Sequence, residues 1–134
     1  MKSFVKFFAI IVTVFFAQVT FAQSADHGHD HTAMKKAAPT VINLSQTPGQ
    51  YEITELNLTA GTYIFEVTNK NVDKELGFYL TPTSDAKAQI PNSGLESLVG
   101  KGQTARTGTV TLTPGTYQYS CPLNPTPHYT ITVK

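Results

Sequence analysis

The stretch that decides the fold is LTPGTYQYSC, residues 112–121, in which a Pro-Gly turn leads into a run of alternating side chains. An earlier stretch, LTAGTYIFEV at residues 58–67, repeats the pattern of a glycine turn that enters a strand. Successive side chains of a strand point to opposite faces, so the larger apolar set of each stretch identifies the face directed into the core. The residues expected on that face are Tyr63, Phe65, Val67, Tyr117, Tyr119 and Cys121.

Outward from these two stretches, further short segments rich in Thr, Tyr, Val and Ile are separated by Gly, Pro and Asn, which is typical of β-strands and turns. The predicted strands are residues 41–44, 51–58, 62–68, 76–80, 107–112, 116–121 and 129–133. Seven short strands in about 95 residues predict an all-β, Greek-key antiparallel β-sandwich. Residues 84–104, which contain a proline and three glycines, are expected to form a long surface excursion with a helical turn or two.

Composition excludes several classes of protein. The chain has 134 residues, which is room for one domain. Charged residues make up 14% and the formal net charge is +1, a balance that argues against a nucleic-acid-binding protein with a basic stripe. A single cysteine excludes an internal disulfide framework and a zinc site made of cysteines alone. The sequence has no glycine-rich phosphate loop, so we expect no nucleotide-binding site.

The first 22 residues have the pattern of a secretory signal peptide. Lys2 and Lys6 precede a nearly apolar run over residues 7–17, and a small residue, Ala22, ends the segment. A membrane anchor is the alternative, but the run is shorter than the about 20 apolar residues of a membrane span. We therefore expect cleavage after Ala22, no later membrane span, and a periplasmic or secreted protein. Cleavage removes both lysines and takes the formal net charge from +1 to −1.

Residues 23–40 show no apolar periodicity and are expected to form a flexible leader before the folded domain, residues 41–134. Three of the chain's four histidines, His27, His29 and His31, lie in this leader among acidic residues. Imidazole binds copper, zinc and nickel, so the leader is a candidate metal-binding arm. The alternative is a solubilising segment in which the histidines occur by chance.

A second cleavage position, after Ser24, sharpens the metal hypothesis. It leaves Ala25, Asp26 and His27 at a free amino terminus. A histidine in third position allows the amine, two backbone amide nitrogens and the imidazole to bind Cu(II) in a plane, which matches the tetragonal preference of that ion. Cleavage at this position therefore predicts a Cu(II) site at the very start of the mature chain.

Residues 115–122, GTYQYSCP, and the closing stretch YTITV at residues 129–133 resemble the cupredoxins, the blue-copper family that includes plastocyanin and azurin. Residues 58–80, with the stretches FEVTN and GFYL, are also similar. The resemblance covers roughly residues 41–134 and implies a Greek-key sandwich. It also implies a copper site built from two histidines, one cysteine and usually a weak axial methionine.

In that family pattern Cys121 is the copper thiolate. Lys74 stands where the resemblance places the first histidine, and Leu123 and Asn124 stand where it places the second. No methionine follows Cys121. His128 is the candidate replacement ligand, although the parity of the closing strand directs it toward solvent. The alternative role for Cys121 is that of a small, buried apolar residue.

The leading hypothesis is an exported copper-binding protein that handles or delivers copper, or transfers electrons through an altered site. Cys121 is its thiolate ligand, His128 a partner ligand, and the leader histidines a capture arm. The alternative is a metal-free cupredoxin-fold binding or structural module. We expect no enzyme, because Cys121 and His128 as nucleophile and base would face opposite sides and lack an orienting third group. A redox or copper-delivery protein is the expected partner, and the protein is expected to be a monomer.

Overall fold

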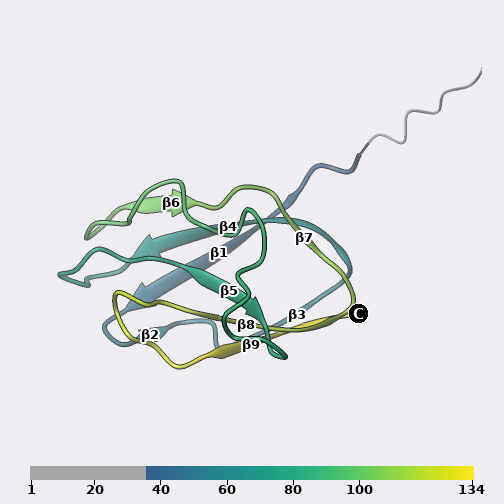
Figure 1. Cartoon of the computed structure of the whole chain (residues 1–134). Helices are drawn as coiled ribbons and strands as arrows, with labels where there is room; N and C mark the ends of the chain where they lie inside the picture. The colour runs from purple at the N-terminus through teal and green to yellow at the C-terminus, as the bar shows by residue number, and fades with distance from the viewer. Residues whose placement is uncertain (1–35) are drawn as a thin grey trace, which may run out of the picture. The chain divides into compact units, whose positions relative to one another are not determined.

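Residues 36–134 are described by the computed structural model, and they form two β-sheets packed face to face (Figure 1). The strands in chain order are β1 (Thr40–Thr47), β2 (Gln50–Tyr51), β3 (Glu55–Leu58), β4 (Gly61–Asn69), β5 (Tyr79–Pro82), β6 (Thr104–Arg106), β7 (Val110–Leu112), β8 (Gly115–Ser120) and β9 (Tyr129–Val133). One sheet has the order β2-β1-β4-β6, with β7 also paired to β4, and the other has the order β3-β9-β8-β5. The predicted all-β sandwich is confirmed.

The two sheets are mixed rather than wholly antiparallel, which corrects the sequence prediction. β1 runs parallel to β4, and β3 runs parallel to β9. The other strand pairs of the described residues are antiparallel. The chain crosses from one sheet to the other between β2 and β3, and crosses back between β3 and β4. Strands that become neighbours through such crossings are not joined by a tight hairpin, so they can run in the same direction.

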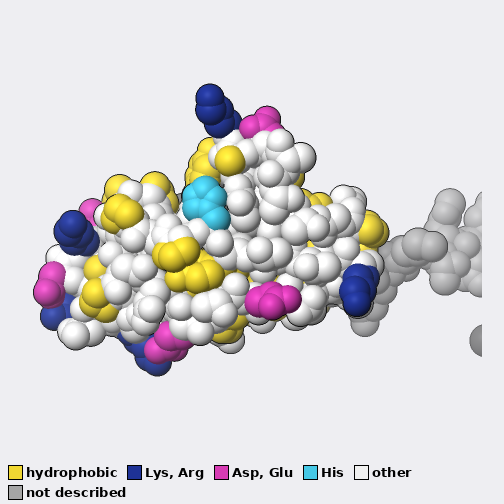
Figure 2. Space-filling model, turned by 90° about the horizontal axis from the view of Figure 1, so that it is seen from below, with side chains coloured by type: hydrophobic (Ala, Val, Ile, Leu, Met, Phe, Trp, Pro, Cys, Tyr) yellow, Lys and Arg dark blue, Asp and Glu magenta, His cyan; other side chains and the backbone are white. Residues whose placement is uncertain are grey.

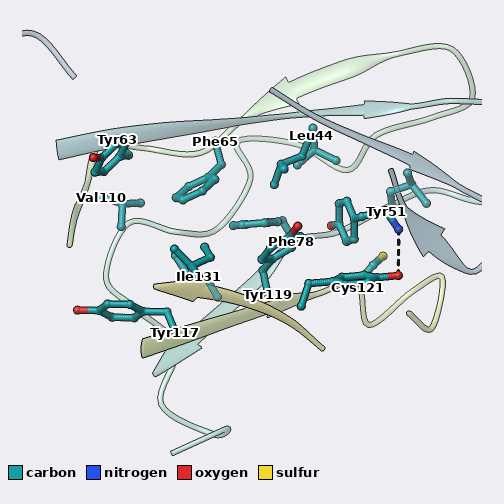
Figure 3. Close-up of a cluster of buried hydrophobic side chains, with 14 of the residues drawn as sticks. Leu44, Tyr51, Tyr63, Phe65, Phe78, Val110, Tyr117, Tyr119, Cys121 and Ile131 are labelled. Atoms are coloured by element: carbon teal, nitrogen blue, oxygen red, sulfur yellow. Dashed lines mark hydrogen bonds between the residues drawn. The ribbon is translucent and has the colours of Figure 1, made fainter. Parts of the chain in front are cut away.

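Alternation with a period of two fills the space between the sheets. In β4, β8 and β9 every second side chain is buried. The six core residues predicted from the two glycine-turn stretches are all buried, with exposed fractions of 8% or less. Figure 3 shows Leu44 and Phe65 of one sheet facing Tyr119 and Ile131 of the other. The predicted core face is therefore confirmed.

Two predicted strands are interrupted because the chain changes its partner inside them. Predicted strand 51–58 is divided into β2 and β3, since residues 52–54 carry the chain from one sheet to the other. Predicted strand 76–80 starts later, as β5, because Leu76 forms an isolated antiparallel bridge with Val99. Residues 76–78 therefore lie outside both sheets, and one of them, Gly77, is hydrogen-bonded to the Cys121 sulfur.

Predicted strand 107–112 starts later, as β7, and the sequence prediction missed β6 before it. The break between them lies at Thr107, whose buried hydroxyl accepts the backbone N–H of Phe65 at 3.0 Å. Residues 84–104 do form a mostly exposed excursion, but it consists of turns and bridges such as Leu95 to Thr107, without the expected helical turn. Within residues 36–134 no helix is long and apolar enough to cross a membrane.

The two glycine-turn stretches share a tyrosine contact. The Tyr63 hydroxyl donates to the backbone oxygen of Thr59 at 2.7 Å, and the Tyr117 hydroxyl donates to that of Thr113 at 3.0 Å. Each tyrosine thereby closes the turn that leads into its own strand while its ring lies in the core, much as a tyrosine corner does. The repeat in the sequence is therefore also a repeat of local structure.

Candidate functional site

Cys121 follows directly after β8, and it is 2% exposed. Its sulfur accepts the backbone N–H of Gly77 at 3.4 Å and the backbone N–H of Asn124 at 3.2 Å. Figure 3 shows the sulfur close to Tyr51, at one end of the cluster of buried side chains. The predicted inward direction of Cys121 is confirmed, and its sulfur accepts hydrogen bonds from two buried backbone amides.

Tyr51 is the phenol near this sulfur and is 1% exposed. Burial raises the pKa of Tyr51 far above its ordinary value, and nearby Cys121 adds to the rise. The Tyr51 hydroxyl donates to the backbone oxygen of Gly77 at 3.5 Å. Because the phenol keeps its proton at neutral pH, its oxygen offers no negative charge to a metal ion.

The side chain of Asn124 is 8% exposed and is hydrogen-bonded to β1 and to the turn that follows it. Its Oδ1 accepts the backbone N–H of Gly49 at 3.2 Å, and its Nδ2 donates to Oε1 of Gln46 at 2.7 Å and to the backbone oxygen of Thr47 at 3.2 Å. Asn124 stands at one of the positions expected for the second histidine. Only its backbone N–H is hydrogen-bonded to the Cys121 sulfur.

Lys74 does not face the cysteine in the structure. Its side chain is exposed, and its backbone oxygen accepts a hydrogen bond from the buried side chain of Asn69 at 3.0 Å. Asn69 also donates to the backbone oxygen of Val99 at 3.1 Å. The backbone at Lys74 is thus held toward the interior by the buried Asn69 side chain. The side chain beside the Gly77 amide is Leu76, which is 0% exposed. An apolar residue, rather than Lys74, therefore lies next to the amide that reaches the sulfur.

His128 is exposed, as the strand parity predicted, because the next residue, Tyr129, is buried. Figure 2 shows histidine, in cyan, on the molecular surface. In the described part of the chain, the hydrogen bonds of the Cys121 sulfur come from backbone amides and not from His128. Nor do three His, Cys, Asp or Glu side chains gather as a metal site anywhere in residues 36–134. The predicted leader ligands, which lie outside the described residues, are His27, His29 and His31.

Sequence reasoning missed Gln46, which is 0% exposed and belongs to the same buried network. A signal was present, because Gln46 follows Leu44 by two residues in β1 and therefore shares its inward face. The Gln46 Nε2 atom is buried without a hydrogen-bond partner. A buried polar side chain at an inward position indicates a network that the strand pattern alone does not reveal.

The groups around Cys121 do not fit a blue-copper centre of two imidazoles and a thiolate. The donors that reach the sulfur are the amides of Gly77 and Asn124, while the protonated phenol of Tyr51 donates to the backbone oxygen of Gly77. The arrangement suits a buried sulfur that accepts hydrogen bonds from two separate segments of the chain.

Comparison with known proteins identifies the fold. No family model and no curated protein matches the sequence. Auracyanin A, a blue copper protein from the photosynthetic bacterium Chloroflexus aurantiacus, is similar in structure with a TM-score of 0.55 and 19% identity, over 72% of this chain and 100% of that one. Auracyanin B matches with a TM-score of 0.54 and 18% identity, over 72% of this chain and 91% of that one. A reduced amicyanin variant matches with a TM-score of 0.50 and 18% identity, over 70% and 82% of the two chains. The described domain therefore has the cupredoxin fold.

Proposed function

We propose that this protein is an exported copper-handling protein that binds copper through His27, His29 and His31, and that its cupredoxin-fold domain is not an electron-transfer centre. The observation that carries the proposal is that His128, the histidine among residues 36–134, is exposed, and that no three His, Cys, Asp or Glu side chains gather in those residues. A blue-copper thiolate requires imidazole partners. Three of the chain's four histidines lie in the leader, so copper is assigned there.

The ligand chemistry of the leader supports copper capture followed by release. Its histidines lie among Asp26 and Asp30, and Met34 follows them with a thioether that suits Cu(I). A segment that gathers its ligands only on binding loses conformational entropy, and this weakens its hold on the metal. A partner protein with a preformed site is therefore favoured to take the copper. This is the chemistry of a delivery protein, and it needs no catalytic step.

β1 carries the chain from its entry into the sandwich to the end at which Cys121 lies. The described chain enters the sandwich at Thr40, and Gln46 lies at the Cys121 end of the same strand. At about 3.3 Å per residue, this part of the strand is about 20 Å long. Thr40, where the described chain enters β1, is therefore at the opposite end of this strand from Gln46. Copper held by the leader does not require the cysteine, and we propose that the monomeric protein presents it to a copper-accepting protein.

A metal-free binding or structural module is the second candidate. The observation in its favour is that Cys121 and Asn124 are fully engaged in hydrogen bonds that close this end of the sandwich. On that account the leader is only a solubilising segment. Copper binding by the mature chain separates the two candidates.

The test is titration of the purified mature chain with Cu(I) under anaerobic conditions, and then with Cu(II), against a chromogenic chelator. We expect stoichiometric binding by the unmodified chain and by the Cys121→Ala variant. We expect it to be lost when His27, His29 and His31 are all replaced by alanine. His128→Ala is the matched control, because it removes one exposed imidazole and should leave binding unchanged.

Three results would overturn the proposal. If the unmodified chain fails to compete with a weak chelator for either ion, the metal-free module is correct. If the Cys121→Ala or His128→Ala variant loses its copper while the triple leader variant retains it, the site lies in the domain. An intense visible thiolate-to-copper band would likewise return the function to electron transfer.

A further inference from the structure

We infer that the open edge of β1 is an interaction surface, and that its occupant is the same edge of a second copy of this chain. The two β1 strands run antiparallel and join the two sheets that contain them into one continuous sheet. A strand pair of this length is a small interface, so the dimer is weak and dissociates on dilution into the monomer to which copper delivery is assigned above. The inference concerns the domain alone and does not rest on copper binding by the leader.

The first step is the direction of the backbone groups of β1. In a parallel pair of strands, alternate residues direct their N–H and C=O groups toward the neighbouring strand. The backbone oxygen of Gln46 accepts the N–H of Lys70, which directly follows β4. The backbone oxygen of Ser45 accepts the N–H of Glu52, which lies on the other side of β1. Ser45 therefore directs its backbone groups away from β4, and so does every second residue before it.

Val41 and Asn43 occupy those positions, and their outward backbone groups have no hydrogen-bond partner within residues 36–134. β2 pairs only with the last two residues of β1, because the chain then crosses to the other sheet (Figure 1). Both residues are exposed, and the exposed fraction of Val41 is 39%. Residues 40–44 thus form an open strand edge in the described part of the chain.

Other edge strands of the two described sheets have features that oppose pairing with another chain. Charged side chains, proline and short length are such features. Glu55 lies in β3, Pro82 in β5 and Arg106 in β6, while β2 and β7 have three residues or fewer. β1 has eight residues, none of them charged and none of them proline. Its edge is therefore long enough to pair, and no like charges face each other when two copies meet.

The register of the pair follows from the groups that are free. In an antiparallel pair, alternate residues lie opposite a residue with which they exchange both N–H···O bonds. If Val41 lies opposite Asn43 of the second copy, the reverse pair forms as well, about a twofold axis at Ile42. Ile42, which packs against the core, then faces its own copy in the closer, non-hydrogen-bonded position. The edge is complementary to itself, and for this reason a second copy is the assigned occupant.

The test is sedimentation equilibrium of the purified mature chain from micromolar to millimolar concentration, with a chelator present to exclude dimers bridged by metal. We expect a reversible equilibrium between monomer and dimer. The double variant Val41→Lys, Asn43→Lys places like charges opposite each other and should weaken the dimer about tenfold or more. The double variant Val41→Glu, Asn43→Lys places opposite charges there and should dimerise at least as well as the parent. Thr130→Lys, at an exposed position of β9, is the control and should leave the equilibrium unchanged.

Amide hydrogen exchange of the unmodified chain tests the strand pairing directly and needs no substitution. The amides of Val41 and Asn43 should exchange about tenfold more slowly, or slower still, at millimolar than at low micromolar concentration, because pairing supplies acceptors for them. The amide of Ile42 is directed toward β4 and should be protected at both concentrations. This contrast between neighbouring residues distinguishes strand pairing from a general loss of solvent access.

The inference is overturned if the unmodified chain stays monomeric at millimolar concentration, or if the amides of Val41 and Asn43 exchange alike at both concentrations. It is also overturned if the two-lysine variant associates as the parent does, or if the glutamate–lysine variant is no better than the two-lysine variant. A dimer that forms only when copper replaces the chelator is a metal-bridged dimer and likewise contradicts the inference. Failure of the leader to bind copper leaves it intact.

Discussion

At the scale of single residues, the cysteine end of the sandwich depends on buried polar groups that keep one protonation state. Tyr51 and Tyr119 lie within 5.1 Å of each other, measured between ring centres, and burial raises the pKa of both. The Tyr119 hydroxyl donates to the backbone oxygen of Ile53, and the Tyr51 hydroxyl donates to that of Gly77. Protonated phenols fit this apolar space, whereas phenolates would require solvation that it does not provide.

The raised pKa of Tyr51 predicts a loss of stability at alkaline pH. Above its ordinary pKa of 10.0, Tyr51 ionises in the unfolded chain but stays protonated in the folded one. The unfolded state then binds fewer protons, so the free energy of unfolding falls by about 1.4 kcal/mol per pH unit from this residue. Tyr51→Phe should make the decline shallower by that amount. Chemical denaturation of both proteins between about pH 9 and pH 11 measures the free energy of unfolding as a function of pH. The same decline in both proteins would contradict the raised pKa of Tyr51.

Residue-level prediction from the sequence succeeded where the argument was local and failed where it was not. Alternation along one strand placed Cys121 inward and His128 outward, because parity is a property of consecutive residues. The partners of Cys121 could not be found in this way. Gly77 and Gln46 reach the cysteine end only through the tertiary fold, and the inward position of Gln46 in β1 does not reveal that its partner is Asn124.

At the scale of elements, the two glycine-turn stretches have the same tyrosine contact, but their glycines differ in backbone conformation. Gly115 has φ +154°, a conformation that residues with a side chain rarely adopt. Gly61 has no such angle, and a methyl group there would be 3.8 Å from its nearest neighbour, an ordinary contact. The turn before β8 therefore requires glycine, whereas the turn before β4 does not.

The glycine difference predicts unequal alanine substitutions. Gly115→Ala should lower the free energy of unfolding by about 1–3 kcal/mol, because alanine is strained at this backbone angle. Gly61→Ala should be neutral or should stabilise by about 0.4–1 kcal/mol, because it reduces the freedom of the unfolded chain. Urea denaturation of the two variants side by side measures the difference. Equal effects would show that the two turns are equivalent after all.

The shared tyrosine contact predicts a matched pair of effects. Tyr63→Phe and Tyr117→Phe each remove one hydroxyl that closes a turn, so each should cost about 0.5–1.5 kcal/mol of stability. Tyr79→Phe is the control, because its hydroxyl donates to Lys87 in an exposed contact and should matter less. Thermal unfolding of the three variants provides the comparison. If one of Tyr63→Phe and Tyr117→Phe strongly lowers stability and the other does not, the two tyrosine contacts are not equivalent and the prediction is wrong.

Strand positions were predictable from the sequence, whereas strand partners were not. β4, β8 and β9 have uninterrupted alternation, and the predicted strands lie within one residue of them. Predicted strand 51–58 failed because its two halves belong to different sheets, and nothing in a local pattern shows the crossing at residues 52–54. The parallel pairing of β1 with β4 was missed for the same reason, since register and direction are set by contacts distant in sequence.

At the scale of the whole molecule, the described domain has the cupredoxin fold, and three of the chain's four histidines lie before it in the sequence. The sandwich buries Cys121 directly after β8, where its sulfur accepts two backbone amides. The central claim is that copper function and the cysteine belong to different parts of the chain. A fold alone does not determine function, so the ligands themselves must be identified.

Copper-edge X-ray absorption of the Cu(II)-loaded mature chain is the measurement that tests this claim most directly, because it identifies the atoms bound to the metal. The account predicts a first shell of nitrogen and oxygen with no sulfur, and an identical spectrum for the Cys121→Ala variant. A sulfur ligand in the unmodified chain that disappears in Cys121→Ala would contradict the account and place the copper in the domain.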